Sequence, residues 1–301
     1  MVQVNVEDIT RLPVAECTAT LVADALTRSF EGYVMPVIVS AEGYERRFRP
    51  ENVDPFASYV YFRRTRPVAT VLIARRGWTS RIAAMAVAPE ARGKGLGRRI
   101  MESVIAEAAS RGDRFVLLEV FEHNTPAVEL YKGLGFEPLR RLVGYHHDPG
   151  GAVSDAAGTV SDAAGTVSEL DPLEFARILA REGEPGLPWM LTAETLSGAV
   201  SPARAFHLDR RAHALIGDPG AAVIFLTALV VPRANRRRGW GTRLMQSLFA
   251  TFPQRSWSIP QVVPEGLAPE FFARCGWELQ KTNQLEMALD LSQKPEGHED
   301  G

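Results

Sequence analysis

The sequence predicts an α/β protein of two tandem domains with mixed, mostly antiparallel sheets, and three observations lead to this prediction. First, a glycine-rich loop at 92–97 joins an apolar run at 82–87 to a helix with one apolar face. Second, a loop of the same kind recurs at 236–241, 144 residues further on (236 − 92 = 144). Third, residues 154–160 repeat without change at 161–167, and such small residues bury little surface. We therefore expect two domains joined by a linker.

The composition fits two globular domains and excludes several classes of function. The chain has 301 residues, 46% of them hydrophobic, and a domain usually takes roughly 150 residues. Its 34 basic and 36 acidic residues give a net charge of −2, which argues against nucleic-acid binding. There is no N-terminal apolar leader and no run of about 18 apolar residues, so we expect a cytoplasmic protein that does not bind membranes. Cys17 and Cys275 lie far apart, and no ligand spacing predicts a metal.

The first half alternates strands and helices. Three of its strands read as an antiparallel meander. Pro126 suits the first turn of a short helix that Asn124 or Thr125 caps, and Gly135 ends that helix. The expected elements, in order, are a strand at 2–6, helices at 14–29 and 41–48, strands at 57–63, 68–76 and 79–87, a helix from the loop to about 111, a strand at 114–120, the short helix after 124, and a strand at 136–143.

The loop at 92–97 is suited to a phosphate group. Glycines leave backbone N–H groups accessible, and the start of a helix carries partial positive charge. A Walker loop is excluded, because it needs Lys and then Ser or Thr after its last glycine, where Arg98 and Arg99 follow instead. A dinucleotide-binding loop is the lesser alternative: it needs a glycine at position 98 and no gap after the strand, although Glu119 imitates its ribose-binding carboxylate.

The second half repeats the organisation of the first, which indicates an internal duplication. The loop positions 92, 95 and 97 recur as Arg236, Gly239 and Gly241, and the apolar face of the following helix recurs at the same offset. Residues 271–277 match 130–136 at an offset of 141 (271 − 130 = 141). We therefore expect an N-terminal domain at 1–148, a low-complexity linker at 149–169 and a C-terminal domain at 170–301.

Several motifs of the first half together resemble the GNAT N-acetyltransferase superfamily. Arg92, Gly95 and Gly97 satisfy its coenzyme A loop, Arg/Gln-x-x-Gly-x-Gly/Ala. The segment 118–120 (Leu-Glu-Val), followed by Asn124 and the residues to 136, looks like the second half of its core, in the branch that includes the ribosomal-protein N-terminal acetyltransferases. The resemblance covers about 81–143. It implies two tandem GNAT-like domains, acetyl-CoA as cosubstrate, and transfer of the acetyl group to an amine.

The same resemblance implies which residues bind the coenzyme. Backbone N–H groups in the loop would hold its pyrophosphate, the strand edge before the loop would pair with the pantetheine arm, and Asn124 would bind that arm as well. A simple helix cap is the alternative role for Asn124. The implied coenzyme-binding residues are Met85, Ala86, Val87, Arg92, Gly93, Lys94, Gly95, Leu96, Gly97, Arg98, Asn124, Ala127 and Tyr131.

Two residues are expected to transfer protons. A lysine-like amine has a pKa of about 10.4, so only about one molecule in 10³ is neutral at pH 7 and a general base helps. By the resemblance this base is Glu119, twelve residues before Tyr131 (131 − 119 = 12). A tyrosine, with a pKa of about 10, stays protonated at pH 7, so Tyr131 is the candidate acid for the leaving thiolate. A surface ion pair for Glu119 and a core position for Tyr131 are the alternatives.

The second copy departs from this pattern, and the acceptor is not specified. Phe272 stands at the position of Tyr131 and Glu265 at that of Asn124, so we expect the second copy to be degenerate. The acceptor would enter over 30–55. Candidates for contact there are four aromatic residues and three arginines: Phe30, Tyr33, Tyr44, Phe48, Arg46, Arg47 and Arg49. We expect a small-molecule primary amine; a protein N-terminus or lysine, or coenzyme binding without catalysis, are the alternatives. The two copies would imitate a dimer within one chain, so we expect a monomer or a weak homodimer.

Overall fold

The computed structural model describes residues 9–33, 37–149 and 166–292. The chain forms two compact units. Unit 1 consists of Met1–Leu139 and Glu286–Gly301, and unit 2 consists of Arg140–Leu285. The expected strand at 2–6 and most of the expected linker lie outside the described residues.

Unit 1 contains a mixed sheet in the strand order β1-β2-β3-β4-β5-β13. Adjacent strands from β1 to β4 are antiparallel, whereas β4 and β5 are parallel. This confirms the predicted meander and the mostly antiparallel sheet. The strands are β1 (Ile9–Pro13), β2 (Tyr59–Arg63), β3 (Arg66–Arg76), β4 (Thr79–Val87), β5 (Phe115–Phe121) and β13 (Gln284–Asp290).

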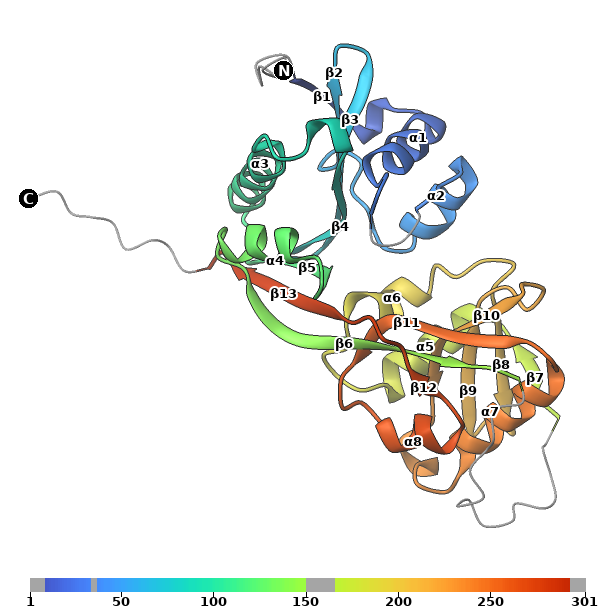
Figure 1. Ribbon diagram of the computed structural model, residues 1–301. Helices are drawn as coiled ribbons and strands as arrows, with labels where there is room; N and C mark the ends of the chain where they lie inside the picture. The colour runs from blue at the N-terminus through green and yellow to red at the C-terminus, as the bar shows by residue number, and fades with distance from the viewer. Residues whose placement is uncertain (1–8, 34–36, 150–165, 293–301) are drawn as a thin grey trace, which may run out of the picture. The chain divides into compact units, whose positions relative to one another are not determined.

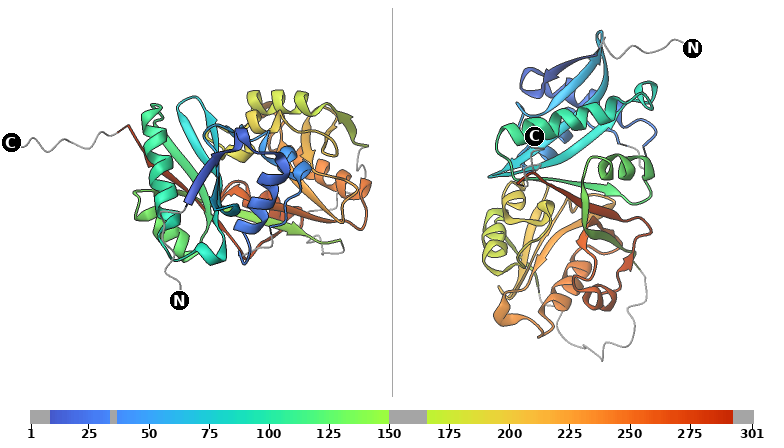
Figure 2. Two further views of the ribbon diagram at one scale, coloured as in Figure 1. Left: turned by 90° about the horizontal axis from the view of Figure 1, so that it is seen from above. Right: turned by 90° about the vertical axis from the view of Figure 1, so that its left-hand side faces the viewer.

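Helices cover both faces of this sheet. Helices α1 and α2 lie on one face and α3 lies on the other (Figure 1, Figure 2). Thr18 accepts a hydrogen bond from the Leu21 N–H, so α1 begins at Ala19, and Ser40 caps α2 in the same way through Gly43. The helices are η2 (Val14–Glu16), α1 (Ala19–Ser29), α2 (Ala41–Phe48), η3 (Pro89–Ala91), α3 (Leu96–Ser110) and α4 (Thr125–Lys132).

The α1/α2 face of unit 1 is closed by a hydrophobic core. Val22 and Leu26 of α1 pack with Phe48 of α2 and with Val60 and Leu72 of the sheet, and all five are buried. Burying such a side chain contributes about 1.5–3 kcal/mol, so this core fixes α1 against the sheet. Ala83 and Ala84 of β4 also pack against this core, so the core supports β4 and the loop that follows it.

Unit 2 repeats this plan. Its strands follow the order β11-β10-β9-β8-β7, and β6 pairs with β11 and with β12. Again a single pair, β10 with β11, is parallel in the part of unit 2 that the structure describes. The elements are β6 (Glu137–His147), β7 (Ser168–Leu170), α5 (Pro172–Glu182), η4 (Trp189–Leu191), α6 (Ala193–Leu196), β8 (Arg204–Leu208), β9 (Ala212–Ile216), β10 (Val223–Val230), η5 (Arg233–Asn235), α7 (Trp240–Thr251), β11 (Ser256–Pro264), α8 (Pro269–Arg274) and β12 (Glu278–Leu279).

The units do not follow the order of the sequence at two strands. Most of β6, which comes from the first half of the chain, belongs to unit 2, and most of β13, which ends the second half, belongs to unit 1 beside β5. The division therefore falls at 139 and 285 instead of at the linker. A fragment that ends near 148 would lack β13, which lies beside β5.

Candidate functional site

The parallel strands β4 and β5 of unit 1 are paired over only part of their length. Their pairing runs from Thr79 with Phe115 to Ile82 with Leu118, and the structure gives no further pair between them. Beyond this point β4 still pairs with β3 as far as Val87. Residues 83–87 therefore present one edge of β4 to the space beside β5, and backbone N–H and C=O groups on such an edge are available for a bound chain.

The glycine-rich loop lies at the end of this free edge. Gly93 and Gly95 have φ angles of +71° and +77°, in the left-handed region that favours glycine. Gly95 is the N-cap of α3, and the N–H of Arg99 bonds to its carbonyl at 3.2 Å. The N–H groups of 96–98 precede the first such bond of the helix, so they are free to bind an anion.

Gly97 permits a close approach between α3, β4 and α4. A Cβ atom at this position would lie 3.3 Å from Cε of Met85, 3.7 Å from Cδ2 of Leu130 and 3.8 Å from Cγ2 of Val87. Gly97 therefore keeps the start of the helix against the strand edge, and it sets the width of the space between the loop and α4.

The side chains of Arg92 and Lys94 donate hydrogen bonds to backbone carbonyl groups around the loop. Arg92 donates from Nε to the carbonyl of Val87 at 2.7 Å and from Nη2 to that of Glu31 at 2.5 Å. Lys94 donates to the carbonyl of Glu90 at 2.9 Å. Their positive charges stay beside the loop, but the side chains hold the loop against β4 and against the end of α1.

Tyr131 lies on α4, in an apolar environment. Its side chain is buried, and its ring meets that of Phe136 edge-on at 5.9 Å. Burial, and then the neighbouring Tyr33, raise the pKa of Tyr131 above the ordinary value. The hydroxyl therefore keeps its proton throughout the physiological pH range. Half-buried Ala127 lies in the first turn of the same helix, where its N–H bonds to the carbonyl of Asn124 at 3.0 Å.

Tyr33 joins this group from the segment that follows α1. Burial raises the pKa of Tyr33, and the nearby side chain of Asn124 partly offsets this rise. Its ring packs against Phe30 at 5.1 Å and Phe121 at 6.3 Å. The Asn124 side chain makes no capping bond to α4. The sequence placed Tyr33 only among the aromatic candidates for acceptor contact, and nothing in its spacing predicted that it lies near Asn124.

Glu119 forms part of a buried charged triad at the point where β4 and β5 separate. Arg81 donates from Nε to both oxygens of Glu119 at 2.9 Å, and from Nη1 to Glu51 at 2.6 Å. All three side chains are less than a tenth exposed. Burial disfavours the charge of Arg81, but the two carboxylates raise its pKa above the ordinary value. The ion pair of Glu119 is therefore buried, not on the surface.

Of the other expected acceptor contacts, two are part of the core. Tyr44 and Phe48 are buried, with ring centroids 5.6 Å apart. Burial raises the pKa of Tyr44 to about 12. Arg46 pairs with Glu42, and Arg47 lies 3.8 Å from Glu51.

Unit 2 keeps the loop but changes the groups around it. Gly239, with φ +78°, is the N-cap of α7, and Arg236 donates to the carbonyl of Val231 at 3.0 Å, as Arg92 does in unit 1. The residue at the Gly93 position is Arg237, which adopts φ +58°. Phe272 stacks on Tyr145 at 4.1 Å, so an apolar ring occupies the position of Tyr131.

The described ranges contain neither a group of metal-binding side chains nor a helix suited to cross a membrane. Across 9–33, 37–149 and 166–292, no three His, Cys, Asp or Glu side chains are grouped so that they could hold a metal ion. In the same ranges no helix has both the length and the apolar character needed to cross a membrane.

Comparison with known proteins relates this geometry to one family. The sequence model of the acetyltransferase (GNAT) family matches residues 22–136. The chain is 37% identical over 79 residues to the catalytic subunit of the N-terminal acetyltransferase B complex of Schizosaccharomyces pombe, covering 26% of the chain and 44% of that protein. It is 38% identical over 60 residues to the thialysine N-epsilon-acetyltransferase of Bos taurus, covering 20% and 35%. The chain thus spans less than half the length of these curated relatives.

A solved structure with two copies of the fold matches almost the whole chain. A tandem GNAT protein from the clavulanic acid biosynthesis pathway covers 95% of this chain with 100% of its own length, at a TM-score of 0.68 and 15% identity. At that identity the likeness concerns the fold alone. It agrees with the predicted duplication.

Proposed function

We propose that this chain is an acetyltransferase of the GNAT family, whose model matches residues 22–136, and that unit 1 transfers the acetyl group of acetyl-CoA to the primary amine of a small molecule. One observation carries the proposal most directly: the free edge of β4 leads to the phosphate-type loop at one end, and the loop and the edge lie beside α4, which carries the buried Tyr131. These are the parts that a coenzyme-dependent acyl transfer to an amine requires.

The residues of unit 1 fit the coenzyme. The N–H groups of 93–98 would hold its pyrophosphate, and the free edge at Met85–Val87 would pair with the amides of its arm. Asn124 and Ala127, at the start of α4, would contact the same arm. Arg92 and Lys94 would act mainly by fixing the loop, because their donors are already used on backbone carbonyls.

Tyr131 is the proposed acid. Acetyl-CoA supplies the acetyl group as a thioester, and its sulfur must gain a proton when the acetyl group leaves. Tyr131 holds a proton at its hydroxyl, and burial strengthens that hold until a basic thiolate forms nearby. A thiol has an ordinary pKa of about 8.5, so proton transfer from tyrosine becomes favourable only through positioning and exclusion of water.

Glu119 is the proposed proton acceptor, acting through a water molecule. Arg81 contacts both carboxylate oxygens, but two oxygens offer about four lone-pair directions, which leaves room for one further donor. The triad would hold the carboxyl group of Glu119 in place where the two strands separate. A role limited to the ion pair is the competing interpretation, and the stability and activity of a Glu119→Gln variant separate the two.

The acceptor side is proposed to lie near Tyr33. Phe30, Tyr33 and Phe121 form an aromatic group beside Asn124 and the acid. Such a wall suits the apolar part of a small amine. One curated relative is named as an N-terminal acetyltransferase, so a protein acceptor is the second candidate. The other is named as a thialysine acetyltransferase. We place the protein in the cytoplasm, as a monomer or weak homodimer.

The test is acetyl transfer by the full chain, followed as release of free thiol from acetyl-CoA. A panel of small primary amines is compared with peptides that have free N-termini. We expect turnover with at least one small amine, and we expect Tyr131→Phe to lower kcat by about 10²–10⁴-fold, a larger factor than any change in the Kd of acetyl-CoA. Turnover with peptides alone would favour the second candidate. Tight binding of acetyl-CoA with no turnover on either panel would favour a non-catalytic role.

A further inference from the structure

The two units can be compared residue by residue, because their sheets share an irregularity. The pairing of β4 with β3 skips Ala83, between Ile82 and Ala84, and the pairing of β10 with β9 skips Thr227, between Leu226 and Ala228 (227 − 83 = 144). With the loop offset of 144, this shift falls at the same place in both units. Thr70 pairs with Ala86 and His213 pairs with Val230, so His213 stands where unit 1 has Thr70.

The same comparison relates the neighbouring strand. Val60 pairs with Thr70 in unit 1, and His207 pairs with His213 in unit 2. In unit 1 this position is closed: Val60 is fully buried in the core, and the hydroxyl of Thr70 lies 3.3 Å from that of Ser29 on α1. Unit 2 has replaced an apolar and a hydroxyl side chain by two imidazoles.

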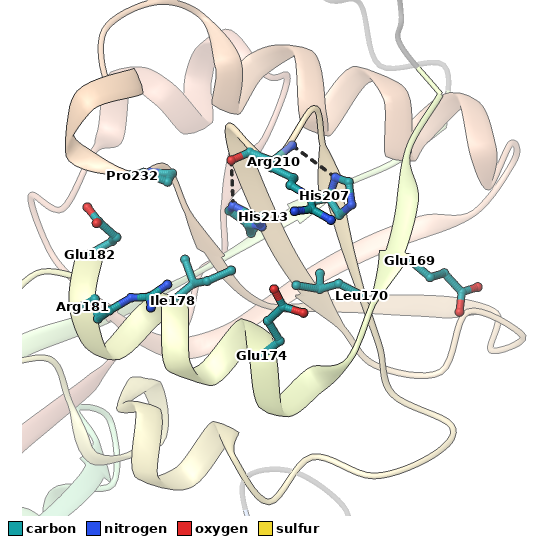
Figure 3. Close-up of a pocket in the computed structure, with 10 residues that line it drawn as sticks. All are labelled: Glu169, Leu170, Glu174, Ile178, Arg181, Glu182, His207, Arg210, His213 and Pro232. Carbon is teal, nitrogen blue, oxygen red and sulfur yellow. Dashed lines mark hydrogen bonds between the residues drawn. The ribbon is translucent and has the colours of Figure 1, made fainter.

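A pocket occupies this place in unit 2. It has a volume of about 330 Å³, and it lies between helix α5 and the strands β8 and β9 (Figure 3). Glu174, Ile178 and Arg181 line it from α5, at spacings of four and three residues that put them on one face of the helix. The volume is at the lower end of the range of about 300–1,000 Å³ for small-molecule sites.

His213 offers an acceptor that no neighbour uses. It is 3% exposed, and its Nε2 lies 3.2 Å from the carbonyl of Arg210 (Figure 3). A carbonyl only accepts, so Nε2 carries the proton and Nδ1 is a lone-pair acceptor. Within the described residues Nδ1 is buried and has no hydrogen-bond partner. A buried acceptor without a partner costs about 1–3 kcal/mol, which a donor on a ligand would recover.

Charged groups of both signs line the same pocket. Glu169 is paired with Arg204 at 2.9 Å, and Glu182 accepts the N–H of Arg233 at 2.9 Å, so two of the three carboxylates are engaged. The third, Glu174, forms no ion pair in the part of the chain that the structure describes. It lies close enough to His213 for its negative charge to favour the protonated imidazole.

The basic groups are similarly available. Among the described residues the guanidinium groups of Arg181 and Arg210 form no ion pair, and both residues line the pocket (Figure 3). His207 accepts the N–H of Arg210 at Nδ1, at 3.2 Å, so its Nε2 carries a proton and is a donor. The pocket thus combines acceptors for a cation with donors for an anion.

We propose that this pocket binds a small zwitterion. Its ammonium group would be held by Glu174 and by Nδ1 of His213, and its anionic group by Arg181 or Arg210. This site is in unit 2 and is independent of acetyl transfer in unit 1. It gives the degenerate copy a function of its own, the recognition of a small molecule.

The test is isothermal titration of the full chain with zwitterions of increasing charge separation: L-alanine, β-alanine and γ-aminobutyrate. Propionate and ethylamine carry one charge each and serve as control ligands. We expect at least one zwitterion to bind, and both control ligands to bind at least about tenfold more weakly.

Variants connect that binding to the pocket. Glu174→Gln is expected to weaken it by about tenfold or more, and so is the double variant His207→Val with His213→Thr, which restores the residues of unit 1. Glu169→Gln is the matched control, because that carboxylate is already paired, and it should leave the Kd within about threefold. Unchanged circular dichroism and unchanged acetyl-CoA binding show that the variants are folded.

Three results would overturn the proposal. The first is that none of the zwitterions binds at about 10 mM, roughly ten times a millimolar Kd. The second is equal binding of propionate or ethylamine. The third is binding that persists unchanged in both Glu174→Gln and the double variant, which would place the zwitterion elsewhere, for example at the acceptor site of unit 1.

Discussion

Replacing Arg81 by methionine is expected to destabilise unit 1 strongly. Arg81 donates to both oxygens of Glu119 at 2.9 Å and to Glu51 at 2.6 Å, and the side chains of Glu51 and Glu119 are 1% and 8% exposed. Methionine fills much of the same space but removes the cation that bridges the two buried carboxylates.

The size of the loss follows from this burial. Removing one partner of a buried ion pair costs about 3–5 kcal/mol, and here two carboxylates lose the same partner, so we expect the upper end. A domain is stable by about 5–15 kcal/mol, so the variant approaches the limit of folding. For a domain of this size, about 5 kcal/mol lowers Tm by about 10–20 °C.

The assay is urea unfolding followed by two signals. Four of the five tryptophans, at 189, 240, 257 and 277, belong to unit 2, so fluorescence reports chiefly on that unit, whereas circular dichroism reports on both. We expect the dichroism transition to move further than the fluorescence transition. The triple variant Glu51→Leu, Arg81→Met and Glu119→Leu should recover most of the loss, since replacing a whole buried network by apolar side chains is often neutral. A loss below about 1 kcal/mol for Arg81→Met, or a triple variant no more stable than the single one, would refute this reasoning.

Further predictions concern the loop, the proposed pocket and the proposed acid. Arg92→Met should weaken acetyl-CoA binding by about tenfold or more, because the loop loses charge-assisted bonds to the carbonyls of Val87 and Glu31, whereas the matched Arg236→Met should leave it unchanged in a binding titration. Burial lowers the pKa of His213, so the unfolded chain takes up its proton first; this contribution to stability is present above about pH 6.5 and is lost as the pH falls towards the lowered pKa. Unfolding free energies at about pH 5.5 and about pH 7.5 should therefore converge in His213→Thr, and an unchanged difference would contradict the assignment. Because burial raises the pKa of Tyr131, the pH profile of kcat should show no loss from this group below about pH 10.

Local signals were enough to predict the framework of the site. The strand at 79–87 and the helix at 41–48 have the expected bounds, and the loop and α3 follow the strand as the glycines and the apolar face indicated. These features depend on residues that are close in sequence, where turn chemistry and periodicity act directly. The helix expected at 14–29 instead begins at Ala19, because Pro13 precedes a short 3₁₀ turn and Thr18 provides the cap.

The features that the sequence did not predict depend on distant partners. Glu51 and Arg81 are 30 residues apart, and Arg81 and Glu119 are 38 apart, so no local pattern indicates the triad. The association of β13 with unit 1 and of β6 with unit 2 is equally non-local, because the residues of a strand do not determine by themselves which strand it pairs with. Likewise, the pair of imidazoles on β8 and β9 is recognised as a difference between the units only when the strand register aligns it with Val60 and Thr70.

The central claim is that unit 1 binds acetyl-CoA through the loop at 92–97, and calorimetric titration of acetyl-CoA tests it most directly. Gly95→Trp and Gly239→Trp are matched variants: both glycines have φ near +78°, and a Cβ atom at either one has no neighbour closer than 3.9 Å, so each indole would fill the space before its loop. We predict one equivalent bound by the wild-type chain, lost in Gly95→Trp and kept in Gly239→Trp. Binding that survives in Gly95→Trp, or no binding by the wild-type chain, would contradict the account.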